Sequence, residues 1–253
     1  MEKLLSQLHI GNVFSYERIT GGRDSIVLKV NSEDGSAFAV RILPRDRIGQ
    51  FRQERHLMKS AQSSGIPVPA VHEVREVDDH AVMVMDWGKG RTVLEELLGS
   101  PNISHELGWN FGKMQRRLHD VMPFHPLREQ WLSAQTEEES KLYEIAFATN
   151  EPKISFLHMD FHPLNVLTEG YNITAVLDWI NASTGDYRYD LARTYSILSA
   201  EEAREYMGVD HRIITNFREA WLDGYYSNEH IREDLSLYVK WANKRLLREM
   251  ATK

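Results

Sequence analysis

Short runs, in which apolar and polar residues alternate or apolar residues cluster, fill the first third of the chain and predict strands. Asp34-Gly35, between two of these runs, is typical of a tight hairpin turn, which needs residues that accept positive φ. A helical periodicity from about Asp46 to Ser60 interrupts the series. The order is therefore β-β-β-α-β-β, with strands predicted at Val13–Thr20, Ser25–Val30, Ser36–Leu43, Val71–Val77 and Ala81–Met85.

After Trp87-Gly88-Lys89-Gly90 the pattern becomes helical. We predict helices at Thr92–Leu98, Ile103–His119, Arg128–Phe147, Asp190–Leu198, Ile213–Tyr226 and His230–Met250, and short strands at Ile154–Leu157 and Ile173–Leu177. The change of pattern predicts an α+β protein with two lobes. A small antiparallel β-sheet with one helix forms the N-lobe (1–86), 87–90 form a hinge, and 91–253 form a mostly helical C-lobe, with ligands expected between the lobes.

Composition narrows the class of protein. The length of 253 residues fits one large domain or two lobes, and 42% hydrophobic with 26% charged residues excludes a disordered chain. The formal net charge of −7 argues against a nucleic-acid binder, whose phosphate contacts need a basic surface. No long apolar run opens the chain, so neither a signal peptide nor a membrane span is predicted. The absence of cysteine excludes disulfides and thiolate chemistry, and we expect a cytoplasmic protein.

The most informative segment is His158–Leu167, which begins where a predicted strand ends and contains Pro163. It carries Asp160 and Asn165, and Asp178 follows the next predicted strand. Two carboxylates and an amide on neighbouring loops can meet around one divalent cation and one hydroxyl group. Phosphoryl transfer needs such a set, because a carboxylate orients the acceptor and oxygen ligands hold Mg²⁺ against the phosphates.

The motifs here resemble those of the aminoglycoside phosphotransferase and choline kinase-like family. Asp160 and Asn165 match the D-x-x-x-x-N spacing of the kinase catalytic loop, and Asp178-Trp179 matches the family's D-W pair. The run Gly185-Asp186…Asp190-Leu191-Ala192 matches a G-D-x-x-x-D-L-A pattern. The resemblance implies a two-lobe protein-kinase-like fold and an enzyme that moves the γ-phosphoryl group of ATP or GTP to a hydroxyl of a small acceptor.

The resemblance also implies roles for single residues. Asp160 corresponds to the catalytic base, and Asn165 and Asp178 correspond to the magnesium ligands. His158 would hold the loop, and Asp190 would be buried and accept hydrogen bonds from it. Taken alone, without the other motif residues, each aspartate has a structural interpretation: Asp160 as a helix cap and Asp178 as a turn residue at the end of a strand.

In the N-lobe the resemblance implies a nucleotide site. Gly22 and Ser25 lie in a glycine-containing turn that corresponds to the family's phosphate-covering turn, although a hairpin without a ligand fits equally well. Ala39 and Arg41 alternate onto one face of a strand and correspond to the Ala and Lys of the kinase V-A-I-K strand. Glu54 is the expected ionic partner of Arg41, unless the two form only a solvated surface pair.

Asp86, Trp87 and Gly88 correspond to the hinge, where backbone groups meet the adenine edge. Packing is the alternative interpretation for Trp87. The chain departs from the family at Arg41, which replaces lysine, and at Met159, which replaces the commonest glycine and is interpreted as a packing residue. A guanidinium group keeps the positive charge but is wider than an ammonium group.

Two other classes of protein fit part of the pattern. His158-x-Asp160-x-His162 has the spacing of a metal-binding motif, so a metallohydrolase is one alternative, but no second histidine cluster supports it. The other is a pseudokinase scaffold that binds nucleotide without turnover, and only Arg41 supports it.

The predicted C-terminal helices carry aromatic and acidic residues. Core packing explains the aromatic residues at near-helical spacing at least as well as a substrate pocket does; these are Trp221, Tyr225, Tyr226, Tyr238 and Trp241. Glu137–Glu139 are interpreted as a solvated helix face. The acceptor therefore stays open among aminoglycosides, amino alcohols, sugars and similar hydroxyl compounds. We expect a monomer or homodimer.

Overall fold

The computed structural model describes residues 1–19, 25–121, 132–149, 151–201, 205, 207–228 and 232–251. It divides into two compact units, Met1–Lys89 and Gly90–Lys253, called unit 1 and unit 2 below. The finer division into lobes with a hinge at 87–90 stays a prediction.

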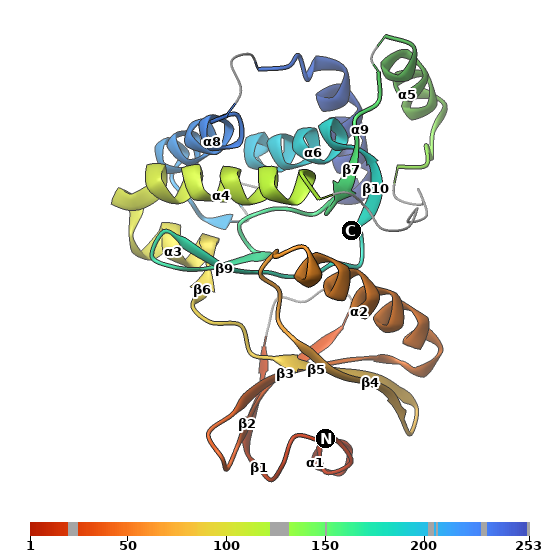
Figure 1. Ribbon diagram of the computed structural model, residues 1–253, viewed down its shortest axis with the longest axis vertical. Helices are drawn as coiled ribbons and strands as arrows, with labels where there is room; N and C mark the ends of the chain where they lie inside the picture. Colours follow the sequence, from red (N-terminus) through yellow and green to blue (C-terminus); the bar gives the residue numbers. More distant parts are fainter. Residues whose placement is uncertain are drawn as a thin grey trace. The chain divides into compact units, whose positions relative to one another are not determined.

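Unit 1 is built on a five-stranded antiparallel sheet in the order β1-β2-β3-β5-β4 (Figure 1). The predicted order of three strands, one helix and two strands is correct. Its elements are α1 (Glu2–Leu5), β1 (Val13–Ile19), β2 (Ile26–Ser32), β3 (Ala37–Pro44), the short 3₁₀ helix η1 (Arg45–Arg47), α2 (Ile48–Ser63), β4 (Val71–Val77) and β5 (His80–Asp86).

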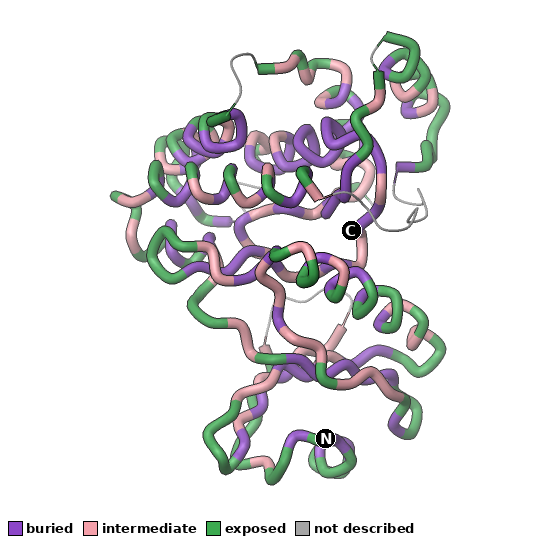
Figure 2. Tube along the Cα trace, viewed as in Figure 1, coloured by how far each residue is buried: buried purple, intermediate pink, exposed green. Residues whose placement is uncertain are grey.

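The strand β5 lies inside the sheet, and its residues 81–85 are all buried (Figure 2). Because successive side chains point to opposite faces, such a strand needs cover on both sides. On one face, Val82 and Val84 belong to a buried cluster with Leu4 and Leu5 of α1. The helix α2 packs against β4 and β5 with its own buried face. The short α1 was not predicted, since four residues give no periodicity.

Unit 2 is mostly helical, as predicted (Figure 1). Its helices are α3 (Val93–Gly99), η2 (Pro101–Ile103), α4 (Ser104–His119), α5 (Glu137–Thr149), α6 (Tyr187–Ser199), α8 (His211–Tyr225) and α9 (Ser236–Ala251). Its strands are β6 (Arg91–Thr92), β7 (Ile154–Leu157), β8 (Val166–Glu169), β9 (Asn172–Val176) and β10 (Ser183–Asp186).

Two predicted helices begin too early. The helix α9 starts at Ser236, where the Asp234 carboxylate accepts the Ser236 N–H, rather than at His230. The helix α5 starts at Glu137, and the Thr136 hydroxyl accepts a hydrogen bond from the backbone of its first turn. In both cases a side chain accepts a hydrogen bond from a backbone N–H at the start of the helix, and this local bond ends the helix there instead of letting it extend further toward the N-terminus. The beginning of the predicted Arg128–Phe147 helix lies outside the described residues.

The helices α4 and α8 approach each other through glycines. A Cβ atom added to Gly112 would lie 2.0 Å from the carbonyl oxygen of Trp221, and one added to Gly108 would lie 2.4 Å from that of Phe217. On the other helix, a Cβ on Gly224 would lie 2.1 Å from the oxygen of Trp109. The two backbones are therefore in direct contact, and only hydrogen fits at these positions.

Two pairs of strands hold the loop region of unit 2. The strands β8 and β9 form an antiparallel hairpin, and β7 pairs with β10. The segment 158–165, called the 158–165 loop below, connects β7 to β8, and Asp178 follows β9. Within the described part of the chain, no helix is long and apolar enough to cross a membrane.

Candidate active site

The register of the β8–β9 hairpin brings the loop ends together. Val166 pairs with Val176, and one step further the Leu177 N–H donates to the Asn165 carbonyl at 2.8 Å. Asn165 and Asp178 therefore lie at the same end of one hairpin, as the spacing of the motif predicts.

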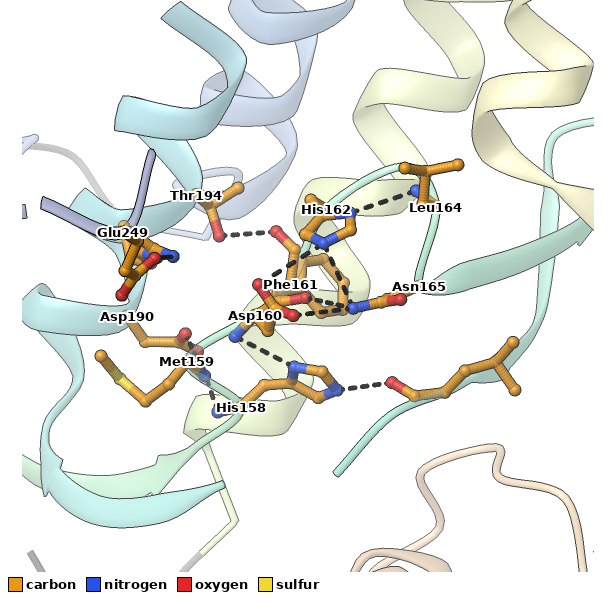
Figure 3. Close-up of polar contacts among 12 residues, drawn as sticks. His158, Met159, Asp160, Phe161, His162, Leu164, Asn165, Asp190, Thr194 and Glu249 are labelled. Atoms are coloured by element: carbon orange, nitrogen blue, oxygen red, sulfur yellow. Dashed lines mark hydrogen bonds and ion pairs between the residues drawn. The ribbon is translucent and has the colours of Figure 1, made fainter. Parts of the chain in front are cut away.

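Asp160 is the centre of the polar contacts in the 158–165 loop (Figure 3). The Asn165 amide Nδ2 donates to the Asp160 Oδ2 at 3.2 Å and to its carbonyl oxygen at 3.1 Å. On the other side, His162 Nε2 lies 3.4 Å from Asp160 Oδ1. The structure thus brings two of the three predicted chemical groups, Asp160 and Asn165, into direct contact.

These neighbours determine the charge of Asp160. Burial raises the pKa of this carboxyl, but His162 and Arg193 oppose it and hold the pKa well below its usual value. Asp160 is therefore ionised at neutral pH. A carboxylate of low pKa is a poor proton acceptor in the ground state, so its first task is to accept a hydrogen bond and orient the donor.

His158 connects the two loops. Its ring Nε2 is 2.9 Å from the Leu177 carbonyl, and its Nδ1 accepts the Asp160 N–H at 3.3 Å. The neutral tautomer with the proton on Nε2 satisfies both bonds. Burial lowers the pKa of His158 more than the nearby Asp190 raises it, which agrees with a neutral ring. The predicted role of His158 in holding the loop is confirmed.

Asp190 on α6 is fully buried and accepts backbone hydrogen bonds from the 158–165 loop, as predicted. Its Oδ1 accepts the Met159 N–H at 2.7 Å, and its Oδ2 accepts the His158 N–H at 3.2 Å. The same Oδ2 lies 2.8 Å from Nε2 of His119, at the end of α4. His119 was missed, because a lone histidine at a helix end carries no sequence signal.

Two residues of the site have left-handed backbone conformations. Met159 has φ 63° and Asp178 has φ 59°. Glycine adopts this conformation without a steric cost, which gives a physical reason for the family's glycine at the position of Met159. The interpretation of Met159 as a packing residue describes its buried side chain but overlooks its backbone. Such strain is retained where surrounding contacts fix it, and here Asp190 holds the Met159 N–H.

The donor set fits magnesium better than zinc. Each hydrogen bond of the Asn165 side chain among the described residues uses its nitrogen, which leaves its oxygen for a cation. Asp178 follows at the same end of the hairpin. Mg²⁺ commonly takes one or two protein oxygens and completes its shell with phosphate and water. Among the described residues, no group of three His, Cys, Asp or Glu side chains could hold a metal ion, and both ring nitrogens of His158 are engaged. These observations argue against the metallohydrolase.

In unit 1, the predicted ion pair is present. Arg41 on β3 binds Glu54 on α2, and its Nε lies 3.4 Å from the Ser25 hydroxyl. Glu54 is 1% exposed, so the alternative of a solvated surface pair is wrong. Ala39 lies on the same face of β3 and is buried. Gly22 lies outside the described residues.

The predicted hinge residues follow β5. Asp86 contacts the His72 ring at 2.6 Å, and the Trp87 N–H donates to the Ala37 carbonyl at 3.0 Å. The ammonium group of Lys29 lies 5.0 Å from the Trp87 ring centre. Gly88 is half-buried. The role of these residues in adenine binding stays a prediction.

The C-terminal aromatic residues belong to the core. Trp221, Tyr225, Tyr238 and Trp241 are all buried, so the packing interpretation is correct. The interpretation of Glu137–Glu139 as a solvated face is wrong for Glu139, which is buried and binds Arg248 of α9. A run of three acidic residues suggested exposure, but an arginine from a distant helix neutralises this one.

Comparison with known proteins agrees with this geometry. The model of the phosphotransferase enzyme family matches residues 15–233. No curated protein sequence matches the chain.

Solved structures share the fold at low sequence identity. An aminoglycoside-3'-phosphotransferase of type VIII is 18% identical, with a TM-score of 0.68 over 98% of both chains. The aminoglycoside phosphotransferase APH(3'')-Id from Streptomyces rimosus, in complex with ADP and streptomycin, is 18% identical, with a TM-score of 0.61 over 96% of this chain and 97% of that one. A thermostable mutant of APH(4)-Ia with AMP-PNP and hygromycin B is 17% identical, with a TM-score of 0.62 over 100% and 99%. The predicted α+β, kinase-like fold is confirmed.

Proposed function

Because the chain belongs to the phosphotransferase enzyme family, we propose that it transfers the γ-phosphoryl group of ATP or GTP to a hydroxyl of a small acceptor. The enzyme class follows from the family, and the residue roles are our proposal. The observation that supports them best is the contact between Asp160 and Asn165 at the end of the hairpin that also carries Asp178.

Asp160 orients the acceptor. Its ionised carboxylate accepts a hydrogen bond from the acceptor hydroxyl, and as the oxygen–phosphorus bond forms it takes the hydroxyl proton while the nucleoside diphosphate leaves. Asn165 holds the carboxylate in place through its Nδ2. Asn165 and Asp178 would hold Mg²⁺, which neutralises charge on the phosphates when bound.

Unit 1 supplies the nucleotide contacts in this proposal. Arg41, oriented by Glu54, carries the positive charge for the phosphates, and Gly22 and Ser25 supply donors from the turn. Ala39, Asp86, Trp87 and Gly88 would contact the base. An arginine held by a buried carboxylate presents a fixed guanidinium edge, which fits phosphate oxygens.

The acceptor class is the open part of the proposal. The solved relatives named above are aminoglycoside phosphotransferases, two of them with streptomycin or hygromycin B bound, so aminoglycosides are the first candidates. Amino alcohols and sugars are the next.

A coupled ADP-release screen with MgATP and MgGTP tests the proposal over aminoglycosides, amino alcohols and sugars. We expect turnover with at least one acceptor. Asp160→Asn should lower kcat by about 10²–10⁴-fold, because the amide cannot take the proton, while nucleotide binding is retained. Asp79→Asn, in an exposed turn, is the matched control and should behave as the wild type.

The other outcomes identify the alternatives. Nucleotide binding without turnover for any acceptor would favour the scaffold. Full activity of Asp160→Asn would remove Asp160 from its assigned role.

A further inference from the structure

A row of three buried hydrogen bonds runs from α8 to the 158–165 loop. The Trp221 Nε1–H donates to Gln115 Oε1 at 2.9 Å, and the Gln115 Nε2 donates to the Thr194 hydroxyl at 2.9 Å. The Thr194 hydroxyl then donates to the Phe161 carbonyl at 2.9 Å (Figure 3). All four residues are fully buried.

The chemistry of the donors gives this row one direction. An indole N–H can only donate, so Trp221 fixes which end of the Gln115 amide faces it. The amide nitrogen must then face Thr194, whose own hydrogen is left for the Phe161 carbonyl. Hydrogen bonds in such a row polarise one another inside a low-dielectric core.

The row and Asp190 hold the loop on the two sides of Asp160 along the chain. Asp190 and Thr194 are one helical turn apart and therefore lie on the same face of α6. Asp190 binds the backbone just before Asp160, and Thr194 binds it just after. A threonine inside a helix usually returns its hydroxyl to the preceding turn, and this one reaches another segment instead.

Close packing of α4 on α8 sets the far end of the row. Gly112 lies one turn before Gln115 and touches the Trp221 backbone, where a Cβ atom would meet the carbonyl oxygen at 2.0 Å. The position of Gln115 relative to Trp221 is therefore fixed by backbone contact as well as by the hydrogen bond.

We propose that Thr194, held by Gln115 and Trp221, is a positioning residue that fixes the peptide after Asp160 and so aims the Asp160 carboxylate at the acceptor hydroxyl. This inference rests on the proposed function. A buried carbonyl that loses its donor is free to tilt, and a small displacement of a reacting group lowers the rate of transfer by about 10- to 100-fold. The nucleotide contacts assigned to unit 1 do not depend on this row.

Thr194→Val removes the hydroxyl and keeps the shape of the side chain, and Thr194→Ser keeps the hydroxyl. The matched control is Ser196→Ala on the same helix, because the Ser196 hydroxyl is equally buried and has no hydrogen-bond partner among the described residues. Gln115→Met, which leaves Thr194 in place, is a second variant in case Thr194→Val does not fold.

Two measurements decide the question. With MgATP and an acceptor from the screen, Thr194→Val should lower kcat by about 10-fold or more at an ATP KM within about twofold of wild type, and Gln115→Met should act in the same direction. Amide hydrogen exchange without ligands should be faster in peptides covering 158–165. Thr194→Ser and Ser196→Ala should match the wild type in both.

Wild-type kcat or unchanged loop exchange in Thr194→Val would overturn the proposal. A rise in KM equal to the fall in kcat/KM, at unchanged kcat, would also overturn it, because that pattern reports lost binding. If the wild type turned over no acceptor, the proposed function would fail, while the exchange measurement would still decide whether Thr194 holds the loop.

Discussion

His158 shows how a single side chain holds two backbone segments of the candidate site together. Its ring joins the Leu177 carbonyl to the Asp160 N–H, and therefore joins the backbone beside Asp178 to the backbone of Asp160. Trp179 packs edge-on against the ring, with centroids 4.9 Å apart. A protonated ring would place a donor against the Asp160 N–H, so only the neutral form fits.

The stability of the protein should fall as the pH drops below about 6.5, the ordinary pKa of histidine. Burial lowers the pKa of His158 in the folded chain, so the unfolded chain takes up its proton first. Each pH unit below that value, down to the folded pKa, should then cost up to about 1.4 kcal/mol of unfolding free energy from this group. Urea unfolding at about pH 7.5 and about pH 5.5 measures the difference.

Other groups also titrate over this range, so variants isolate the contribution of His158. His158→Gln should show a smaller pH dependence than the wild type. His105→Gln, at an exposed position of α4, should keep it. Equal pH dependence in all three proteins would contradict the assignment.

At the residue scale, the sequence motifs predicted Asp160, Asn165 and Asp178 as candidate site residues, because their spacing is fixed by a local strand–loop–strand geometry. The left-handed backbone conformation of Met159 and Asp178 could not be predicted from the sequence, since neither residue type requires it. The partners His119, Gln115 and Thr194 could not be predicted either, because each is a common residue in an ordinary helical pattern.

At the scale of elements, the contact between α4 and α8 determines how the site is supported. Glycines on both helices let the two backbones touch. This contact places Gln115 and His119 of α4, which bind Thr194 and Asp190, the two α6 residues that hold the 158–165 loop. The periodicity of α4 shows which face is buried but not that a backbone lies against it.

Gly112→Ala should destabilise the protein by about 1–3 kcal/mol, because the new Cβ would meet the Trp221 carbonyl oxygen at 2.0 Å and the backbone there cannot move aside cheaply. Gly49→Ala is the matched control in α2, where an added Cβ meets nothing within 4 Å, and it should cause no loss. Urea unfolding measures both. Equal stability of the two variants would mean that α4 and α8 separate without cost.

Longer elements were predicted more reliably than short ones. The strands of unit 1 and α4 lie within two residues of their predicted bounds, because each is long enough to show a run of apolar or alternating residues in the sequence. The strands β8 and β10 have four residues each and were missed, although β8 fixes the position of Asn165. Such short strands exist because a neighbouring strand pairs with them.

At the scale of the whole molecule, each compact unit carries part of the proposed chemistry. Unit 1 holds the Arg41–Glu54 pair, and unit 2 holds Asp160, Asn165 and Asp178. A nucleotide bound to the folded chain stabilises it by mass action, so binding can be followed on the complete protein.

AMP-PNP with Mg²⁺ should raise the Tm of the wild type, with a stabilisation of about 2.7 kcal/mol at a ligand concentration of 100 times Kd. Asp178→Ala should lose the magnesium-dependent part of this effect, because it removes a proposed ligand of the cation. Calorimetric titration with and without Mg²⁺ measures the same loss directly.

Asp79→Ala, in an exposed turn of unit 1, changes the net charge equally and should keep the full effect. An Asp178→Ala protein that binds MgAMP-PNP like the wild type would show that this residue does not hold the metal.

The sequence by itself determined the order of the longer strands and helices, the family motifs and the candidate groups of the site, because these depend on residues close together in the chain. Only the tertiary structure decided what holds those groups in place. His119 meets Asp190 across 71 positions, and Gln115 meets Thr194 across 79. The hydrophobic periodicity of a helix indicates which of its faces is buried. Which partner that face meets depends on how the helices pack, and here the packing depends on glycines that allow two backbones to touch.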